Sequence, residues 1–135
     1  MFHIDTFEFN NGTASKVSQL RHDKNNVGLN WPIVYVINND KEAYVGETVS
    51  ASRRIDQHLQ VKQRQKLTEI RIISDSNFNK SVALDLESFL IKYMASDGKY
   101  VLQNGNSGIH DHEYFNRHEY RDEFRKIWKS SPTIF

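Results

Sequence analysis

The sequence predicts a small α/β domain in which a three-stranded antiparallel sheet is flanked by helices. Residues 33–37 (IVYVI) and 42–46 (EAYVG) are two strand-like runs joined by a polar turn, which favours a β-hairpin. Residues 67–74 (LTEIRIIS) are rich in β-branched side chains and predict a third strand. Residues 80–96 carry apolar side chains at helical spacing, which predicts one long amphipathic helix.

Residues 1–30 are expected to form an N-terminal extension to this domain. Residues 3–9 alternate apolar and polar side chains, which indicates a short edge strand. Residues 14–22 fit a short helix. Asparagine and glycine between 25 and 30 then mark a loop that Pro32 closes.

The helices after the hairpin complete a domain that we expect to span residues 31–129. A surface helix is expected at about 50–63, with Thr48 or Ser50 as its cap. Asp97-Gly98 ends the long helix, and residues 104–108 (NGNSG) form a polar turn. A last helix is expected at about 111–129, and residues 130–135 are expected to be a tail cut from a longer chain. The last helix is expected to direct five side chains to the core: Phe115, Tyr120, Phe124, Ile127 and Trp128.

The composition excludes several classes of protein. The chain of 135 residues suits one domain, and it has no cysteine, so disulfides and thiolate metal sites are excluded. It has no apolar run of the roughly 18–20 residues that span a membrane and no signal peptide, so we expect a cytoplasmic protein without a membrane partner. Neither GxGxxG nor GxxxxGK[ST] occurs, so dinucleotide and P-loop chemistry are not indicated.

The charge is small overall but uneven. The net charge of +1 argues weakly against binding nucleic acid through bulk charge. Residues 53–71 nevertheless hold six basic and two acidic side chains, a local charge of +4. On charge alone, a solvated helix face and a nucleic-acid contact are about equally good interpretations.

The residues best suited to chemistry lie between Ile33 and His58. Tyr35 and Tyr44 fall on neighbouring strands, within reach of one another if the hairpin register places them on the same face. Arg54 and His58 are four residues apart on the predicted helix and share a face. Gly46 leaves room for the backbone to turn or to approach a ligand closely.

This order of residues resembles the GIY-YIG nuclease family, which is named for two short tyrosine motifs. The first motif is the tripeptide 33–35 (IVY), in which Ile33 replaces the family's glycine, and the second is 44–46 (YVG). The lost glycine supplies backbone room and no reacting atom, so the tyrosine is unaffected while the motif loses some specificity. The resemblance covers roughly residues 31–106 and extends to about 129 with the last helix. It continues in order through Glu47-Thr48, Arg54, His58, Glu87 and Asn104, with Asn106 as the alternative to Asn104.

The resemblance implies a GIY-YIG nuclease fold and a metal-dependent endonuclease that cuts DNA. Glu87 would hold Mg²⁺, or Mn²⁺ in its place, together with waters and a phosphate oxygen. Arg54 offers a permanently charged fork for phosphate oxygens. His58 would activate water or hold a tyrosine hydroxyl. Tyr35, slightly favoured, or Tyr44 would act as general base, which requires a fall from a phenol pKa of about 10.

Three further residues are expected to bind substrate or support the site. Gly46 is one, and Asn104 either hydrogen-bonds backbone groups or contacts a phosphate. Lys80 is expected to cap the long helix together with Ser81, and from there it could also reach a phosphate. Arg53 is expected to be an ordinary surface residue. A zinc site is a weak alternative, because its histidines do not follow the HExxH spacing: His110, His112 and His118, with Asp111.

A looser likeness concerns a possible fused partner. The segments FNKSVALDLESFLI and LQNGN resemble the nuclease domain at the front of larger proteins that carry a P-loop ATPase or helicase-like region. This likeness implies such a domain in the parent chain. It also leaves a competing hypothesis, a catalytically silent module that binds nucleic acid or protein, against which the full set of candidate catalytic residues argues.

Overall fold

A fully buried strand, β2 (Ile33–Asn38), forms the centre of the fold that the computed structural model describes for residues 2–104. Its β-branched and aromatic side chains are buried on both faces, so it requires a neighbour on each side and a covering layer above and below. β3 (Glu42–Thr48) and β4 (Glu69–Ser74) are these neighbours, and both pair antiparallel with β2. The predicted hairpin and third strand are therefore correct.

Two outer strands make the sheet larger than predicted. β1 (His3–Glu8) pairs antiparallel with β4, and β5 (Val101–Leu102) pairs parallel with β3, which gives the order β1-β4-β2-β3-β5. The sheet is thus five-stranded and mixed, and the prediction of a three-stranded antiparallel sheet is wrong. Two residues carry too little pattern to reveal β5, and the pairing of β1 joins segments too far apart in sequence for local alternation to indicate it.

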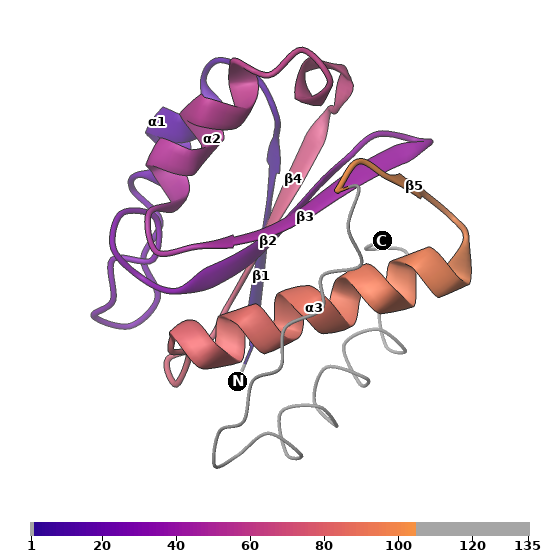
Figure 1. Ribbon diagram of the computed structural model, residues 1–135. Coiled ribbons are helices and arrows are strands. Elements are labelled where there is room, and N and C mark those ends of the chain that lie inside the picture. Colours follow the sequence, from indigo (N-terminus) through magenta and orange to yellow (C-terminus); the bar gives the residue numbers. More distant parts are fainter. Residues whose placement is uncertain (1, 105–135) are drawn as a thin grey trace.

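Helices cover both faces of the sheet (Figure 1). α3 (Lys80–Asp97) packs on one face, against Val34 and Val36. α2 (Ala51–Leu59) and the short α1 (Thr13–Val17) lie on the other face, which carries the alternate side chains of β2. Because successive strand residues point to opposite faces, Tyr35 lies on the α2 face, between Ile33 and Ile37.

The ends of the helices differ in part from the prediction. α1 is shorter than expected, and α2 gives way to a 3₁₀ turn, η1 (Arg64–Lys66). The cap of α3 is Asn79, whose side chain accepts the Val82 N–H at 2.9 Å, so the prediction of a Lys80-Ser81 cap is wrong. Gly98 ends α3 with a φ of 74°, a left-handed conformation that glycine adopts without strain.

Several predicted features lie outside the described residues: the turn at 105–108, the last helix at about 111–129, the histidines of the zinc alternative and the tail. Between residues 2 and 104, no helix is both long and apolar enough to cross a membrane.

Candidate active site

The hairpin register places the two tyrosines of the motifs on the same face. Tyr35 lies opposite Gly46, and Tyr44 lies opposite Ile37. The tyrosines are therefore diagonal neighbours on adjacent strands, and their ring centroids are 6.3 Å apart in a stacked arrangement. The condition that the sequence left open, a shared face, is met.

Gly46 is required by the tyrosine opposite it. A Cβ atom on Gly46 would overlap the Oη and Cζ atoms of Tyr35, whose ring lies across the glycine backbone. Tyr35 is only 3% exposed, so its ring has little freedom to move away. In this structure the missing side chain makes room for a catalytic candidate of the same sheet.

His58 reaches the tyrosines from the buried side of α2. Ala51, Ile55 and His58 recur at helical spacing and form the face that packs on the sheet. The Nε2 atom of His58 lies 2.6 Å from the Tyr35 hydroxyl, and its ring centroid is 4.8 Å from that of Tyr44. We call Tyr35, Tyr44 and His58 the aromatic group.

Burial keeps both partners of the short hydrogen bond neutral. It lowers the pKa of His58 to about 4, and the positive charges of Arg64 and Arg54 act in the same direction. Burial also raises the pKa of Tyr35 well above its ordinary value, as does the neighbouring Tyr44. Near neutral pH the phenol of Tyr35 therefore donates to an uncharged imidazole.

Arg54 lies beside the Tyr35 hydroxyl and opposes the rise in the Tyr35 pKa. Its charge, and a side-chain hydrogen bond to Tyr35, both lower the Tyr35 pKa, although burial outweighs them. The Arg54 side chain is exposed, so it can hydrogen-bond to Tyr35 and bind a ligand from solvent at the same time. This is the group that links the buried aromatic group to the surface.

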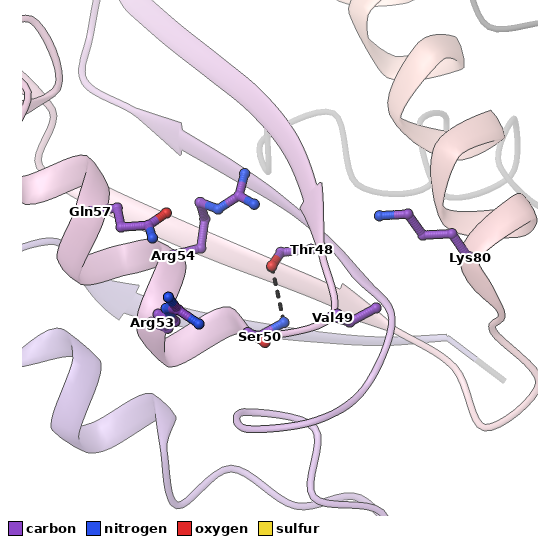
Figure 2. A pocket seen from close by; sticks show the side chains of 7 residues that line it. All are labelled: Thr48, Val49, Ser50, Arg53, Arg54, Gln57 and Lys80. Atoms are coloured by element: carbon purple, nitrogen blue, oxygen red, sulfur yellow. Dashed lines mark hydrogen bonds between the residues drawn. The ribbon is translucent and has the colours of Figure 1, made fainter.

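A cationic cleft of about 310 Å³ opens next to Arg54. Arg53, Arg54 and Gln57 line it from α2, while Lys80 extends toward it from α3 (Figure 2). Its floor is the segment Thr48–Ser50, where β3 ends and α2 begins. Three cationic side chains and no acidic one line the cleft, so its chemistry suits an anion. Arg53, which was expected to be an ordinary surface residue, is exposed and lines this cleft.

Lys80 is held at the cleft by an acidic residue just outside the lining. Its Nζ donates to both carboxylate oxygens of Glu47, at 2.6 and 2.8 Å. Glu47 is 15% exposed and Lys80 is 56% exposed, so the ion pair fixes a solvent-facing ammonium rather than a buried one. Lys80 has no part in capping α3.

Glu87 brings a carboxylate to the site from α3. It follows Lys80 by seven residues, or about two turns, and so lies on the same side of the helix. Its negative charge contributes to the raised pKa of Tyr35, which places it within electrostatic reach of the phenol. Asp85 is a fully buried carboxylate of the same helix that no sequence pattern singles out. Two residues from Glu87, it points to another side of α3.

Glu87 is the half-buried carboxylate that the resemblance implies as the metal ligand. Within residues 2–104, no cluster of three or more His, Cys, Asp or Glu side chains could hold a metal. A zinc-type cage is therefore not formed by this part of the chain. Mg²⁺ is ordinarily held by one or two carboxylates with waters and phosphate oxygens, an arrangement to which Glu87 would contribute a carboxylate oxygen.

Asn104 supports the second tyrosine motif from outside the sheet. Its Oδ1 accepts the Val45 N–H at 3.0 Å, and its Nδ2 donates to the Val45 carbonyl at 2.6 Å. Val45 stands between Tyr44 and Gly46, so this side chain clasps the backbone of the motif. Of the two roles considered for Asn104, backbone hydrogen bonding is the one observed.

Arg64 is a site residue that the sequence reasoning missed. Its guanidinium carbon lies 4.1 Å from the centroid of the Tyr44 ring. In the sequence it is one of several cations in a basic run, and it has no fixed spacing from the motifs. Only the folded position of η1 distinguishes it from its neighbours.

The comparisons with known proteins agree with this geometry. A family model described as the GIY-YIG catalytic domain matches residues 32–100, just over half of the chain. The range contains the aromatic group, Gly46, Arg54 and Glu87, and it ends before Asn104. No curated protein and no solved structure matches the chain.

Proposed function

Because this chain belongs to the family of GIY-YIG catalytic domains, we propose that it is a metal-dependent endonuclease that cuts DNA. Domains of this family are nucleases that hydrolyse phosphodiester bonds and typically use a divalent metal. The observation that carries the proposal is the 2.6 Å hydrogen bond between Tyr35 and His58, beside an arginine that opens onto a cationic cleft.

The cleft supports a phosphodiester as the ligand. Arg54 carries a fork of N–H donors that matches two phosphate oxygens, and its charge does not titrate near neutral pH. Arg53 and Lys80 add positive charge along the same cleft. In our proposal the scissile phosphate lies against Arg54, and neighbouring phosphates of the DNA strand lie against the other two cations.

The aromatic group supports a proton transfer. Removal of the Tyr35 proton is unfavourable in the resting site, because burial favours the neutral phenol. A cation that approaches the phenol favours the phenolate, and His58 already lies at hydrogen-bond distance to take the proton. We therefore propose Tyr35 as the general base, with His58 as its proton acceptor and Tyr44 as the ring that packs against both.

Glu87 is the residue that would hold the metal. A bound Mg²⁺ would supply positive charge for the developing charge on the phosphate. The half-buried position of Glu87 and its electrostatic effect on Tyr35 support this assignment. The fused P-loop ATPase that the looser likeness implies has no support in the family match, which concerns the nuclease domain alone.

A nicking assay tests the proposal. Supercoiled plasmid is incubated with Mg²⁺ or Mn²⁺ and the parent protein, Tyr35→Phe, Arg54→Ala or Glu87→Gln. Asp97→Asn is the matched control, because it removes an exposed carboxylate from the other end of α3. We expect metal-dependent nicking by the parent and the control, and a loss of on the order of 100-fold or more in the three site variants.

Other outcomes would redirect the proposal. Nicking that survives Glu87→Gln would contradict the metal assignment. If a folded parent protein binds DNA and leaves it intact, the domain is a silent binding module instead. A single-stranded RNA substrate, run in parallel, tests the choice of DNA.

A further inference from the structure

The aromatic group lies between two guanidinium groups. Arg54 acts on Tyr35 from the cleft side, and Arg64 lies over the ring of Tyr44. The distance of 4.1 Å from the guanidinium carbon to the ring centroid is well within the range of a cation–π contact. Arg64 is therefore in direct contact with a residue of the site, although it does not line the cleft.

Residues 60–67, the segment between α2 and β4 that carries Arg64, are fixed by contacts on several sides. Leu67, at its end, is 2% exposed and belongs to the core on the α2 face. Three side chains donate to backbone carbonyls of this segment or of the residue that ends α2. They are Gln65 to Leu59 at 2.9 Å, Gln103 to Gln63 at 2.9 Å and Asn39 to Lys66 at 3.2 Å. These contacts fix the backbone at Arg64, so its side chain extends toward Tyr44 from an ordered segment.

The surroundings of Arg64 favour the ring as its partner. Among the described residues, no ion pair includes Arg64, and its Nε atom is buried without a hydrogen-bond partner. The stack on Tyr44 is the contact that orders this side chain.

We propose that Arg64 is a positioning residue of the active site, which holds the Tyr44 ring against His58 and so keeps His58 directed at Tyr35. The inference rests on the proposed nuclease function. Arg64 acts on His58 through two contacts. Arg64 contacts the ring of Tyr44, and the ring centroids of Tyr44 and His58 are 4.8 Å apart. The charge of Arg64 has a second effect, because after burial it is the largest cause of the lowered His58 pKa.

Kinetics on plasmid DNA test the positioning role. Arg64→Ala removes the stack and the charge, whereas Arg64→Lys keeps the charge and loses the flat guanidinium. Lys62→Ala is the matched control, because it removes an exposed cation from the same segment. We expect kcat to fall on the order of 10-fold in Arg64→Ala with KM within about 2-fold of the control, and an intermediate kcat in Arg64→Lys.

The pKa of His58 gives a readout that needs no nuclease activity. The neighbours of the His58 imidazole are Tyr35, Tyr44, Arg54 and Arg64. Loss of Arg64 therefore removes one of the two cations that lower the His58 pKa. NMR titration of the imidazole, assigned by its absence in His58→Gln, should show a higher pKa in Arg64→Ala. Arg64→Lys should stay near the parent value.

The outcomes separate this inference from the proposed function. An unchanged kcat in a folded Arg64→Ala protein, or a rise in KM alone, overturns the positioning role while the nuclease stands. An unchanged His58 pKa overturns it even if the parent does not cut DNA. A shifted His58 pKa in a parent that does not cut DNA supports the arrangement and removes only the nuclease proposal.

Discussion

Tyr35 and His58 are two titratable side chains whose pKa values burial moves in opposite directions, away from each other. The phenol holds its proton more strongly and the imidazole binds one more weakly than in water. Such a pair stays neutral until another charge arrives, which suits a site that should act only on bound substrate. The same burial has a measurable effect on the stability of the fold.

The first prediction concerns acid. The folded pKa of His58 is about 4, below its unfolded value of 6.5, so between these pH values the unfolded chain binds more protons. The contribution of neutral His58 to the unfolding free energy is therefore complete above pH 6.5 and is lost as the pH falls toward 4. Between pH 7 and pH 5 this group should cost about 2 kcal/mol of unfolding free energy. Urea denaturation of the parent and of His58→Gln at both pH values measures it, and an equal loss in the two proteins would count against it.

The second prediction concerns Gly46. In Gly46→Ala the new methyl group overlaps the Tyr35 ring, which the surrounding core holds in place. We expect a loss of roughly 1–3 kcal/mol in unfolding free energy, together with loss of nicking activity. Gly12→Ala is the control, since the nearest atom to its added Cβ is an exposed side-chain oxygen at 3.4 Å. Similar urea midpoints for the two variants would show that the Tyr35 ring can move aside.

The residues of the site that could be predicted are those related by local spacing. Arg54 and His58 share a face because of the helical period, and the tyrosines are joined by a tight hairpin. Glu87 was identified through family resemblance rather than through any pattern of its own. Arg64 and the exact role of Gly46 depend on which segments meet in the folded chain, which no local spacing contains.

At the scale of elements, a side chain continues the pairing of β5 with β3 beyond the backbone hydrogen bonds. The pairing with β3 covers only Glu42–Val101 and Ala43–Leu102. Beyond it, Asn104 meets the Val45 N–H and carbonyl with its own amide. An amide side chain has one donor and one acceptor in a fixed plane, as a peptide group does, and so it can extend a strand pairing by one step.

The third prediction tests this clasp. Asn104→Ala leaves both backbone groups of Val45 without their partner at the sheet edge, which we expect to cost about 1–2 kcal/mol in local stability. Hydrogen exchange of the Val45 amide should become faster by at least about 10-fold. The amide of Val36, which lies opposite Arg71 in the pairing of β2 with β4, is the internal reference. Unchanged exchange at Val45 would show that the clasp does not protect the motif.

The elements that the sequence revealed are those with a strong repeating pattern. β2, β3, β4 and α3 combine apolar periodicity with clear turns, so their existence follows from local patterns. The two residues of β5 are too short for a period to show, and α1 is shorter than the helix predicted at residues 14–22. The cap of α3 is Asn79, one residue before the Lys80-Ser81 pair that the sequence suggests.

At the scale of the whole molecule, charge is concentrated where it can act. A net charge of +1 gives little general attraction to a polyanion, yet three cations gather on one cleft. DNA affinity should therefore be weak and should depend on a few contacts. Whole-chain composition could not predict this, because the cleft joins α2 with the start of α3, residues far apart in the sequence.

The fourth prediction follows from that distribution. Arg53→Ala should weaken DNA binding and reduce the slope of log Kd against log salt concentration by about 1, as expected for the loss of one phosphate contact. Lys92→Ala removes an exposed cation of α3 that does not line the cleft, and it should leave the slope unchanged. Fluorescence anisotropy with a labelled duplex at several salt concentrations gives both slopes. Equal slopes in the two variants would argue that Arg53 touches no phosphate.

The hydrogen bonds between Asn104 and Val45 can form only after the ribosome has synthesised the chain through Asn104. The two residues are 59 positions apart, so at about 5–20 residues per second the ribosome makes Asn104 some 3–12 seconds after Val45. The two tyrosines are already made at the start of that interval, Arg54 and His58 follow early in it, and Glu87 is made before Asn104. Until Asn104 has been made, the edge of β3 at Val45 is not closed, so the support of the second tyrosine motif is completed after the rest of the site.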